Sequence, residues 1–170
     1  MGTPAGGKNL HHGKAAQETG SKEGVFVLLT VTGKQTDPDG NTQESTSVYR
    51  AVCQKSGKGL LFTYSAEEAA ATLFLSRDLA WMQRGRSESS RMVFDPSGTV
   101  TDCDYETAYG IIPMQIRTDR ISVLAGGRRG QAENGTEIIG RGLQARIRYS
   151  LLMGPEYELF CSVTIKVQQI

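Results

Sequence analysis

Three acidic side chains alternate along a short segment of the chain where they could carry chemistry. Asp102, Asp104 and Glu106 are separated by Cys103 and Tyr105, and residues two apart on a β-strand point to the same face. Three carboxylates on one face could bind a hard cation or exchange protons with a substrate. We favour the simpler interpretation, a solvated outer face opposite the inward-facing Cys103 and Tyr105.

Nucleophilic catalysis finds little support in the sequence. The only two histidines, His11 and His12, lie near the N-terminus, so a Ser-His or Cys-His pair would require that segment to fold back. The chain has no Gly-x-Ser-x-Gly, His-Glu-x-x-His or Walker motif. Cys53, Cys103 and Cys161 stand about 50 residues apart without a Cys-x-x-Cys pair, which argues against a zinc site or a disulfide framework. The sequence therefore predicts no catalytic residue, metal ligand or cofactor, and it favours a protein that is not an enzyme.

Arginine is unevenly distributed along the chain. Eleven arginines follow residue 58, against the single lysine Lys166. Seven of these arginines and only three acidic residues lie between Arg117 and Arg148, which gives that stretch a local charge of +4. Its outer strands could bind nucleic acid or protein. However, the stretch from Arg117 to Arg148 contains no aromatic residue on which single-stranded bases could stack, and the next one is Tyr149. An ordinary surface of cross-strand pairs is therefore favoured.

A glycine- and arginine-rich stretch at 126–130 has the composition of a phosphate-binding loop. Glycines allow the backbone to form N–H nests, and Arg128 and Arg129 would neutralise an anion. A phosphate loop normally connects a strand to a helix, and no helix is predicted after residue 130. We therefore expect an exposed hairpin tip here.

The elements that would position these side chains belong to one domain. The chain has 170 residues and a net charge of +1, which is typical of one soluble domain and excludes a globally basic nucleic-acid binder. Residues 1–22 include five glycines and lack the apolar stretch of a signal peptide, so they are predicted to form a flexible tail. A single domain is expected at 23–170. No apolar run is long enough for a membrane-spanning helix, and the odd cysteine count suits a reducing, cytoplasmic location.

Alternating apolar residues predict strands along most of this domain. Val25–Val31, Leu143–Leu151 and Leu159–Val167 alternate in hydrophobicity with a period of two residues. Turn signals join the segments, as in Asp37–Gly40 and Asp95–Gly98, where proline presets φ and glycine supplies the permissive position. Short strands with a turn about every ten residues predict an antiparallel sandwich or barrel.

One segment does not follow the alternating pattern. Ser65 and Glu68 have the spacing of a helix capping box, and three alanines follow them. Because Thr72 begins a new strand-like run, we expect at most a short helical turn in this segment.

Several pieces of the chain together resemble a known family. The order and spacing of five pieces are similar to those of the YwiB-like family of small bacterial proteins: Arg91–Phe94 with Gly98, Tyr105–Gly110, Met114–Thr118 with Ile121, Tyr149–Leu151 and Val163–Val167. The resemblance covers roughly Val25 to Ile170. It implies an all-β, calycin-like fold, an antiparallel lipocalin-type barrel of eight or more strands, and it implies no activity because the family has no established function.

A lipocalin-type barrel can hold one small ligand or be filled by its own side chains. Six aromatic and arginine residues lie on neighbouring strands of the assumed meander, and we take them as candidate ligand-binding residues: Trp81, Arg84, Arg91, Tyr105, Tyr109 and Arg117. Apolar walls with a few convergent polar groups are the usual composition of a binding pocket. The alternative is that these rings simply fill the barrel.

The sequence as a whole favours a non-enzymatic, cytoplasmic barrel that binds a small ligand in or at its mouth, an anion being one option. The alternative is a protein or nucleic-acid interaction module that uses the arginine-rich outer strands, with nucleic acid the less favoured partner. No membrane partner is expected. A homodimer stays open because Phe26 and Leu28 make one outer face partly apolar.

Overall fold

The computed structural model describes residues 23–125 and 142–170, so the tail expected at 1–22 and the hairpin tip expected at 126–130 lie outside the described residues. Ten strands and one short 3-10 turn make up the fold: β1 (Val25–Thr36), β2 (Thr42–Ser56), β3 (Gly59–Ala66), β4 (Ala69–Leu75), β5 (Ala80–Arg84), η1 (Glu88–Ser90), β6 (Met92–Phe94), β7 (Thr101–Thr107), β8 (Gly110–Ala125), β9 (Leu143–Leu152) and β10 (Glu158–Gln169).

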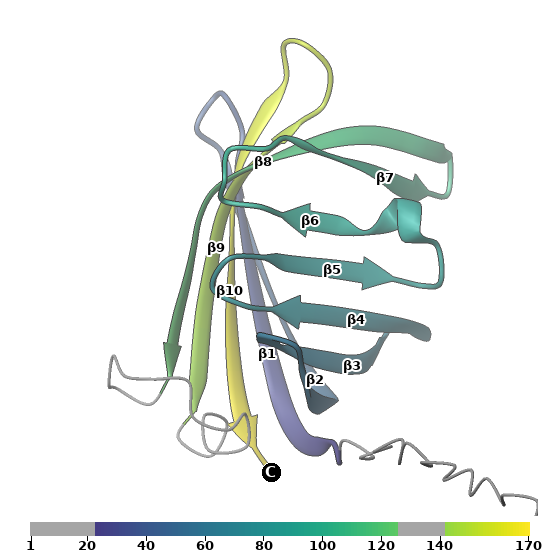
Figure 1. Ribbon diagram of the computed structural model, residues 1–170. Coiled ribbons are helices and arrows are strands. Elements are labelled where there is room, and N and C mark those ends of the chain that lie inside the picture. The colour runs from purple at the N-terminus through teal and green to yellow at the C-terminus, as the bar shows by residue number, and fades with distance from the viewer. Residues whose placement is uncertain (1–22, 126–141) are drawn as a thin grey trace, which may run out of the picture.

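All ten strands belong to one antiparallel sheet, in the order β6-β5-β4-β3-β2-β1-β10-β9-β8-β7. Consecutive strands therefore pair with each other, except that β6 and β7 form the two edges of the sheet. The one pairing between strands far apart in sequence joins β1 to β10 along Val27 to Thr36. Figure 1 shows the sheet rolled up, with β8, β9, β10 and β1 forming one wall and β3 to β6 crossing in front of it. The expected antiparallel, calycin-like barrel of eight or more strands is confirmed.

The two edge strands of the sheet, β6 and β7, meet at a seam. The Thr101 hydroxyl donates a hydrogen bond to the Val93 carbonyl at 2.7 Å, and the Cys103 thiol lies 3.8 Å from the Ser90 carbonyl oxygen. These side-chain contacts close the barrel where no strand ladder joins β6 to β7 in the described part of the chain.

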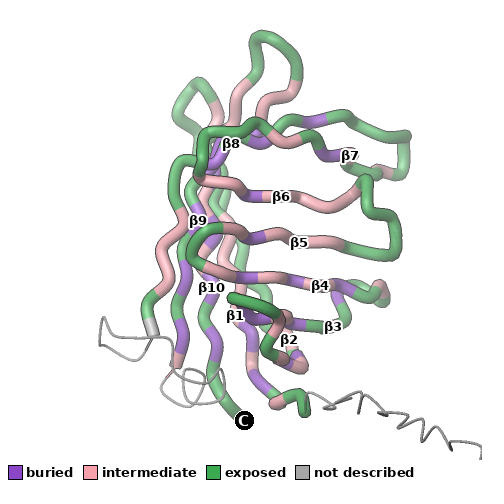
Figure 2. The backbone as a smooth tube through the Cα atoms, viewed as in Figure 1, coloured by how far each residue is buried: buried purple, intermediate pink, exposed green. Residues whose placement is uncertain are grey.

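The barrel interior holds the hydrophobic core, as the alternation predicts. Along β9, Leu143, Ala145 and Ile147 are buried, whereas Gln144 and Arg146 are exposed, and Figure 2 shows the same alternation on neighbouring strands. The largest fully buried apolar side chains are Phe62, Phe94, Leu29, Leu73, Ile116, Ile147, Ile165, Val27 and Val167. Burying each such side chain contributes about 1.5–3 kcal/mol, so this inward face fixes the register of every strand.

The connections between strands alternate between the two ends of the barrel because neighbouring strands are antiparallel. We call the end with the β1–β2, β3–β4, β5–β6, β7–β8 and β9–β10 connections mouth A, and the opposite end mouth B. The expected turn at Asp37–Gly40 is confirmed, with Gly40 at φ 86°. The Asn41 side-chain and backbone N–H groups donate to the Asp37 carboxylate and lower its pKa.

No helical turn follows Ser65, which agrees with the expected limit of at most a short one, and strand β4 already begins at Ala69. β3 and β4 are joined by a two-residue turn in which Glu67 and Glu68 both have positive φ, 46° and 66°. This left-handed turn matches the twist of a β-hairpin, so strand pairing on both sides overrides the local capping-box signal.

No helix within 23–125 or 142–170 has the length and apolar character needed to cross a bilayer.

Two local irregularities constrain the sheet. A Cβ on Gly59 would lie 2.6 Å from the Leu75 carbonyl oxygen, so only glycine fits at the start of β3. A β-bulge shifts the register between Thr118 and Arg120 on β8. The bulge leaves the Thr118 hydroxyl buried without a hydrogen-bond partner in the described structure.

Candidate functional site

Arg84 ends β5 at mouth A, and its side chain lies on the inner face of the barrel. Ala80 and Met82 point inward on the same strand, so alternation places Arg84 on that face too. Strand pairing then aligns Tyr64, Ala71 and Arg84 in one row across β3, β4 and β5. Because Ala71 is small and the row spans two strand spacings of about 4.8 Å, the long Tyr64 and Arg84 side chains can approach over it.

Three tyrosines share the inner face of the barrel with Arg84. The Tyr49 and Tyr64 rings pack with their centroids 4.7 Å apart, and Tyr105, 53% exposed, lies on β7 at the same mouth. Burial raises the pKa of Tyr64, with Tyr49 adding to the rise and the positive charge of Arg84 opposing it. Tyr49 and Tyr105 in turn lie close enough to act on Arg84 electrostatically. We call these four residues the arginine–tyrosine group.

Glu67, in the β3–β4 turn, is the ion-pair partner of Arg84. The hydrogen bond between them raises the pKa of Arg84 and lowers that of Glu67. The two side chains are 54% and 82% exposed, and water screens an ion pair of that kind so that it contributes little to stability. The guanidinium can therefore exchange Glu67 for another anion at small energetic cost.

The arginine–tyrosine group has the chemistry of an anion-binding site. A guanidinium presents parallel N–H donors that match a carboxylate or phosphate. Phenol hydroxyls can donate further hydrogen bonds, and their rings offer an apolar face to the rest of a ligand. The partly buried Met82 and Met92 continue the inner face behind the group and provide adaptable apolar contacts.

The structure does not bring the six sequence-predicted ligand-binding residues together. Only Arg84 and Tyr105 share the inner face at mouth A. Trp81 and Arg91 lie on the outer face, where the Arg91 guanidinium sits 4.2 Å from the centre of the Trp81 ring and the Trp81 ring stacks on Phe74. Arg91 also donates a hydrogen bond to Gln83 at 2.9 Å.

The other two of these six residues lie elsewhere on the barrel. Tyr109 is fully exposed in the β7–β8 turn. Arg117 lies on the outer face of β8, where it forms an ion pair with Glu158 on β10. Strand pairing sets Ser150, which is 1% exposed although it belongs to the outer face, between Arg117 and Phe160. Arg117 therefore packs the outside of the barrel, away from its interior.

Tyr49, Tyr64 and Glu67 are the members of the site that sequence reasoning missed. A signal for the two tyrosines was present, because Tyr49 is in phase with Ala51 and Cys53 on one strand and Tyr64 with Phe62 on the next. Nothing in the sequence pointed to Glu67, since its position depends on the hairpin turn that the capping-box spacing concealed.

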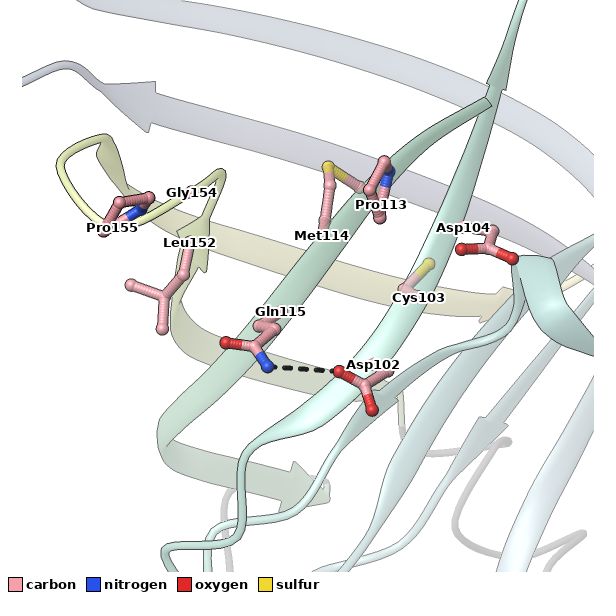
Figure 3. Close-up of a pocket in the computed structure, with 9 residues that line it drawn as sticks. All are labelled: Asp102, Cys103, Asp104, Pro113, Met114, Gln115, Leu152, Gly154 and Pro155. Atoms are coloured by element: carbon pink, nitrogen blue, oxygen red, sulfur yellow. Dashed lines mark hydrogen bonds between the residues drawn. The ribbon is translucent and has the colours of Figure 1, made fainter. Parts of the chain in front are cut away.

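A second feature near mouth A is a groove of about 710 Å³ where β7 and β8 meet the β9–β10 connection (Figure 3). Asp102 and Asp104 line it from β7, and Leu152 and Pro155 line it from the opposite side. The Gln115 amide donates a hydrogen bond to the Asp102 carboxylate at 3.2 Å. Because two carboxylates repel an anion, this groove differs in chemistry from the arginine–tyrosine group.

The acidic strand and the thiols are not arranged for metal binding or nucleophilic chemistry. No group of three or more histidine, cysteine or acidic side chains converges among the residues that the structure describes. Burial raises the pKa of Cys53 to about 12 and that of Cys161 to about 11. Burial, with the Asp104 charge beside it, also raises the pKa of Cys103. All three thiols are therefore protonated at neutral pH, the unreactive form of cysteine.

Comparison with known proteins agrees with this fold. The structure is similar to a solved structure described as the crystal structure of ywiB protein from Bacillus subtilis, with a TM-score of 0.67 and 16% sequence identity over 88% of this chain and 94% of that chain. At that identity the likeness shows the fold alone. No curated protein matches the sequence. A family model described as a domain of unknown function, DUF1934, matches residues 29–165 and confirms the YwiB-like resemblance. The chain therefore belongs to the DUF1934 family.

Proposed function

We propose that the protein is a non-enzymatic barrel that binds a small anionic ligand at mouth A. The observation that carries this proposal is the position of Arg84, a guanidinium on the inner face of a barrel mouth in the same strand row as Tyr64 and within electrostatic reach of Tyr49 and Tyr105. The guanidinium is half-exposed, so it stays accessible to an anion that arrives from solvent at the mouth. Glu67 is its anionic partner in the free protein, through an exposed contact that a ligand can replace.

The ligand class follows from the groups present. A carboxylate or phosphate would take the place of the Glu67 carboxylate on Arg84. The remainder of the ligand would lie against the paired rings of Tyr49 and Tyr64, which favours a planar or aromatic body. Binding, and not catalysis, is proposed because no thiol on the inner wall is ionised at neutral pH.

The proposal is tested with anilinonaphthalene sulfonate, a fluorescent probe that combines an anionic group with aromatic rings. Replacing Arg84 by Gln removes a charge-assisted interaction worth about 1.5–3 kcal/mol, so the affinity for the probe should fall about 10- to 100-fold. Tyr64→Phe, which keeps the ring and removes only the hydroxyl, should weaken binding less than Arg84→Gln.

Arg77→Gln is the matched control, because Arg77 is exposed in the β4–β5 connection at mouth B and its loss changes the net charge equally. The control should bind the probe like the unaltered protein. Equal affinity of the Arg84→Gln and unaltered proteins, measured by fluorescence titration at fixed ionic strength, would show that mouth A is not the binding site.

A further inference from the structure

A patch of positive side chains covers the outer face of β8, β9 and β10. Strand pairing sets Arg120 opposite Arg148, and Arg148 opposite Ser162. In the next rows Arg146 lies between Ser122 and Thr164, and Lys166 lies opposite Gln144. Arg120, Arg146, Arg148 and Lys166 are all exposed. We call these four residues the basic patch.

The β-bulge on β8 creates part of the basic patch. Thr118 points inward, so in a regular strand Arg120 would also point inward. The register shift between Thr118 and Arg120 instead pairs Arg120 with Arg148 on the outer face and returns Ile121 to the interior opposite Ile147. Bulges often re-aim a side chain in this way. The result is two arginines directly opposite each other, an arrangement that disfavours strand pairing when nothing else binds them.

No acidic side chain in the described part of the protein neutralises the basic patch. The two ion pairs found there involve Arg84 with Glu67 and Arg117 with Glu158, and neither includes a member of the patch. Asp119, which sits in the bulge itself, forms no ion pair with Arg120 among the described residues. The side chains between the cations are hydroxyls and an amide, namely Ser122, Ser162, Thr164 and Gln144. These groups can donate hydrogen bonds to phosphate oxygens.

We propose that the basic patch binds the phosphate backbone of a nucleic acid, independently of base sequence. Its four cations span about 16 Å by strand geometry, a length over which one strand presents roughly five phosphates. An acidic protein partner is less favoured because, in the rows of β8, β9 and β10 that carry the cations, Leu124 opposite Gln144 is the one exposed large apolar side chain. Protein interfaces depend on clusters of apolar or aromatic anchors. The proposal concerns the outside of the barrel and does not depend on ligand binding at mouth A.

The test is fluorescence anisotropy with a labelled single-stranded RNA of about 20 nucleotides, measured between about 50 and about 200 mM salt. Four phosphate contacts predict a slope of about −2.8 in log K against log salt, so the affinity should fall about 50-fold over that range. Arg146→Gln/Arg148→Gln leaves two contacts, a slope of about −1.4 and a fall of about 7-fold. The reverse-complement RNA should give the same values.

The control variant is Arg77→Gln/Arg86→Gln, which removes the same charge from exposed connections outside the basic patch. It should keep the full slope. No variant should lower the unfolding midpoint, because every substituted side chain is exposed and Arg148→Gln removes a like-charge pair. If both double variants lower the slope equally, the proposal is overturned, because the slope would then reflect net charge alone. Failure to bind RNA, with binding to anionic lipid vesicles or to an acidic protein in its place, would overturn it as well.

Discussion

Replacing Thr118 by Val should stabilise the protein. Thr118 lies on the inner face of β8 opposite Tyr149, is 5% exposed, and its hydroxyl has no hydrogen-bond partner in the described structure. Valine has nearly the same shape and puts a methyl group where the hydroxyl is. The substitution therefore removes a desolvated polar group without opening a cavity.

The magnitude follows from the cost of an unsatisfied buried hydroxyl, about 1–3 kcal/mol. Some local relaxation around the bulge lowers that figure, so we expect the free energy of unfolding to rise by about 1–2 kcal/mol. For a domain of this size each kcal/mol corresponds to about 2–4 °C, which predicts a midpoint about 2–8 °C higher.

Urea unfolding gives the free energy, and its slope shows whether the denatured state has changed. Thr118→Ser keeps the hydroxyl and removes one methyl group, so it should destabilise the protein by about 1 kcal/mol. Thr164→Val, on the outer face, should change stability by less than about 0.5 kcal/mol. If Thr118→Val destabilises the protein while Thr118→Ser does not, the hydroxyl makes a stabilising hydrogen bond and the reasoning is refuted.

Three further predictions concern the backbone and the buried thiols. Gly59→Ala should destabilise the protein by about 1–3 kcal/mol because its Cβ would overlap the β4 backbone, whereas Gly33→Ala, with its nearest contact at 3.8 Å, should be tolerated; urea unfolding distinguishes the two. Glu68→Gly should raise the unfolding free energy by about 0.5–1 kcal/mol, since glycine adopts the positive φ without strain, and an unchanged or lower value would contradict this. Cys53 and Cys161 have native pKa values of about 12 and about 11 against 9.0 for a free thiol, so their protonated forms stabilise the native state fully below pH 9 and less as the pH rises towards 12. The urea midpoint should fall over that range, and less steeply in Cys53→Ala/Cys161→Ala.

The strands could be predicted from the sequence where one face is buried and the other exposed. Burial alternates along much of β1, β9 and β10, and each of these strands has one face in the core. The turn at 67–68 could not be predicted in the same way, because two glutamates carry no signal for positive φ. The register of β3 against β4 pairs Ala66 with Ala69 and leaves only residues 67 and 68 for the turn, so strand pairing imposes the positive φ on both.

The candidate site was predictable only in part, for a reason of strand geometry. Trp81 and Arg84 are three residues apart on β5, so they point to opposite faces of the sheet. The two-residue period of a strand, applied to the arginines and aromatics, would have placed Trp81 and Arg84 on opposite faces. It would also have placed Tyr64 on the inner face, in phase with Phe62, and so among the candidate site residues. The pairing of Tyr49 with Tyr64, by contrast, depends on the register between β2 and β3, which no local pattern reveals.

The pairing of β1 with β10 has a consequence for how the protein is made. Of the ten strands, β1 leaves the ribosome first and β10 leaves it last. The meander from β1 to β6 can form during synthesis, but one edge of β1 stays unpaired until the final strand is available. Until then the nascent chain exposes a long strand edge of the kind that recruits other strands. This stage of synthesis is therefore the most vulnerable to aggregation, and binding of a chaperone to β1 would protect the chain through it.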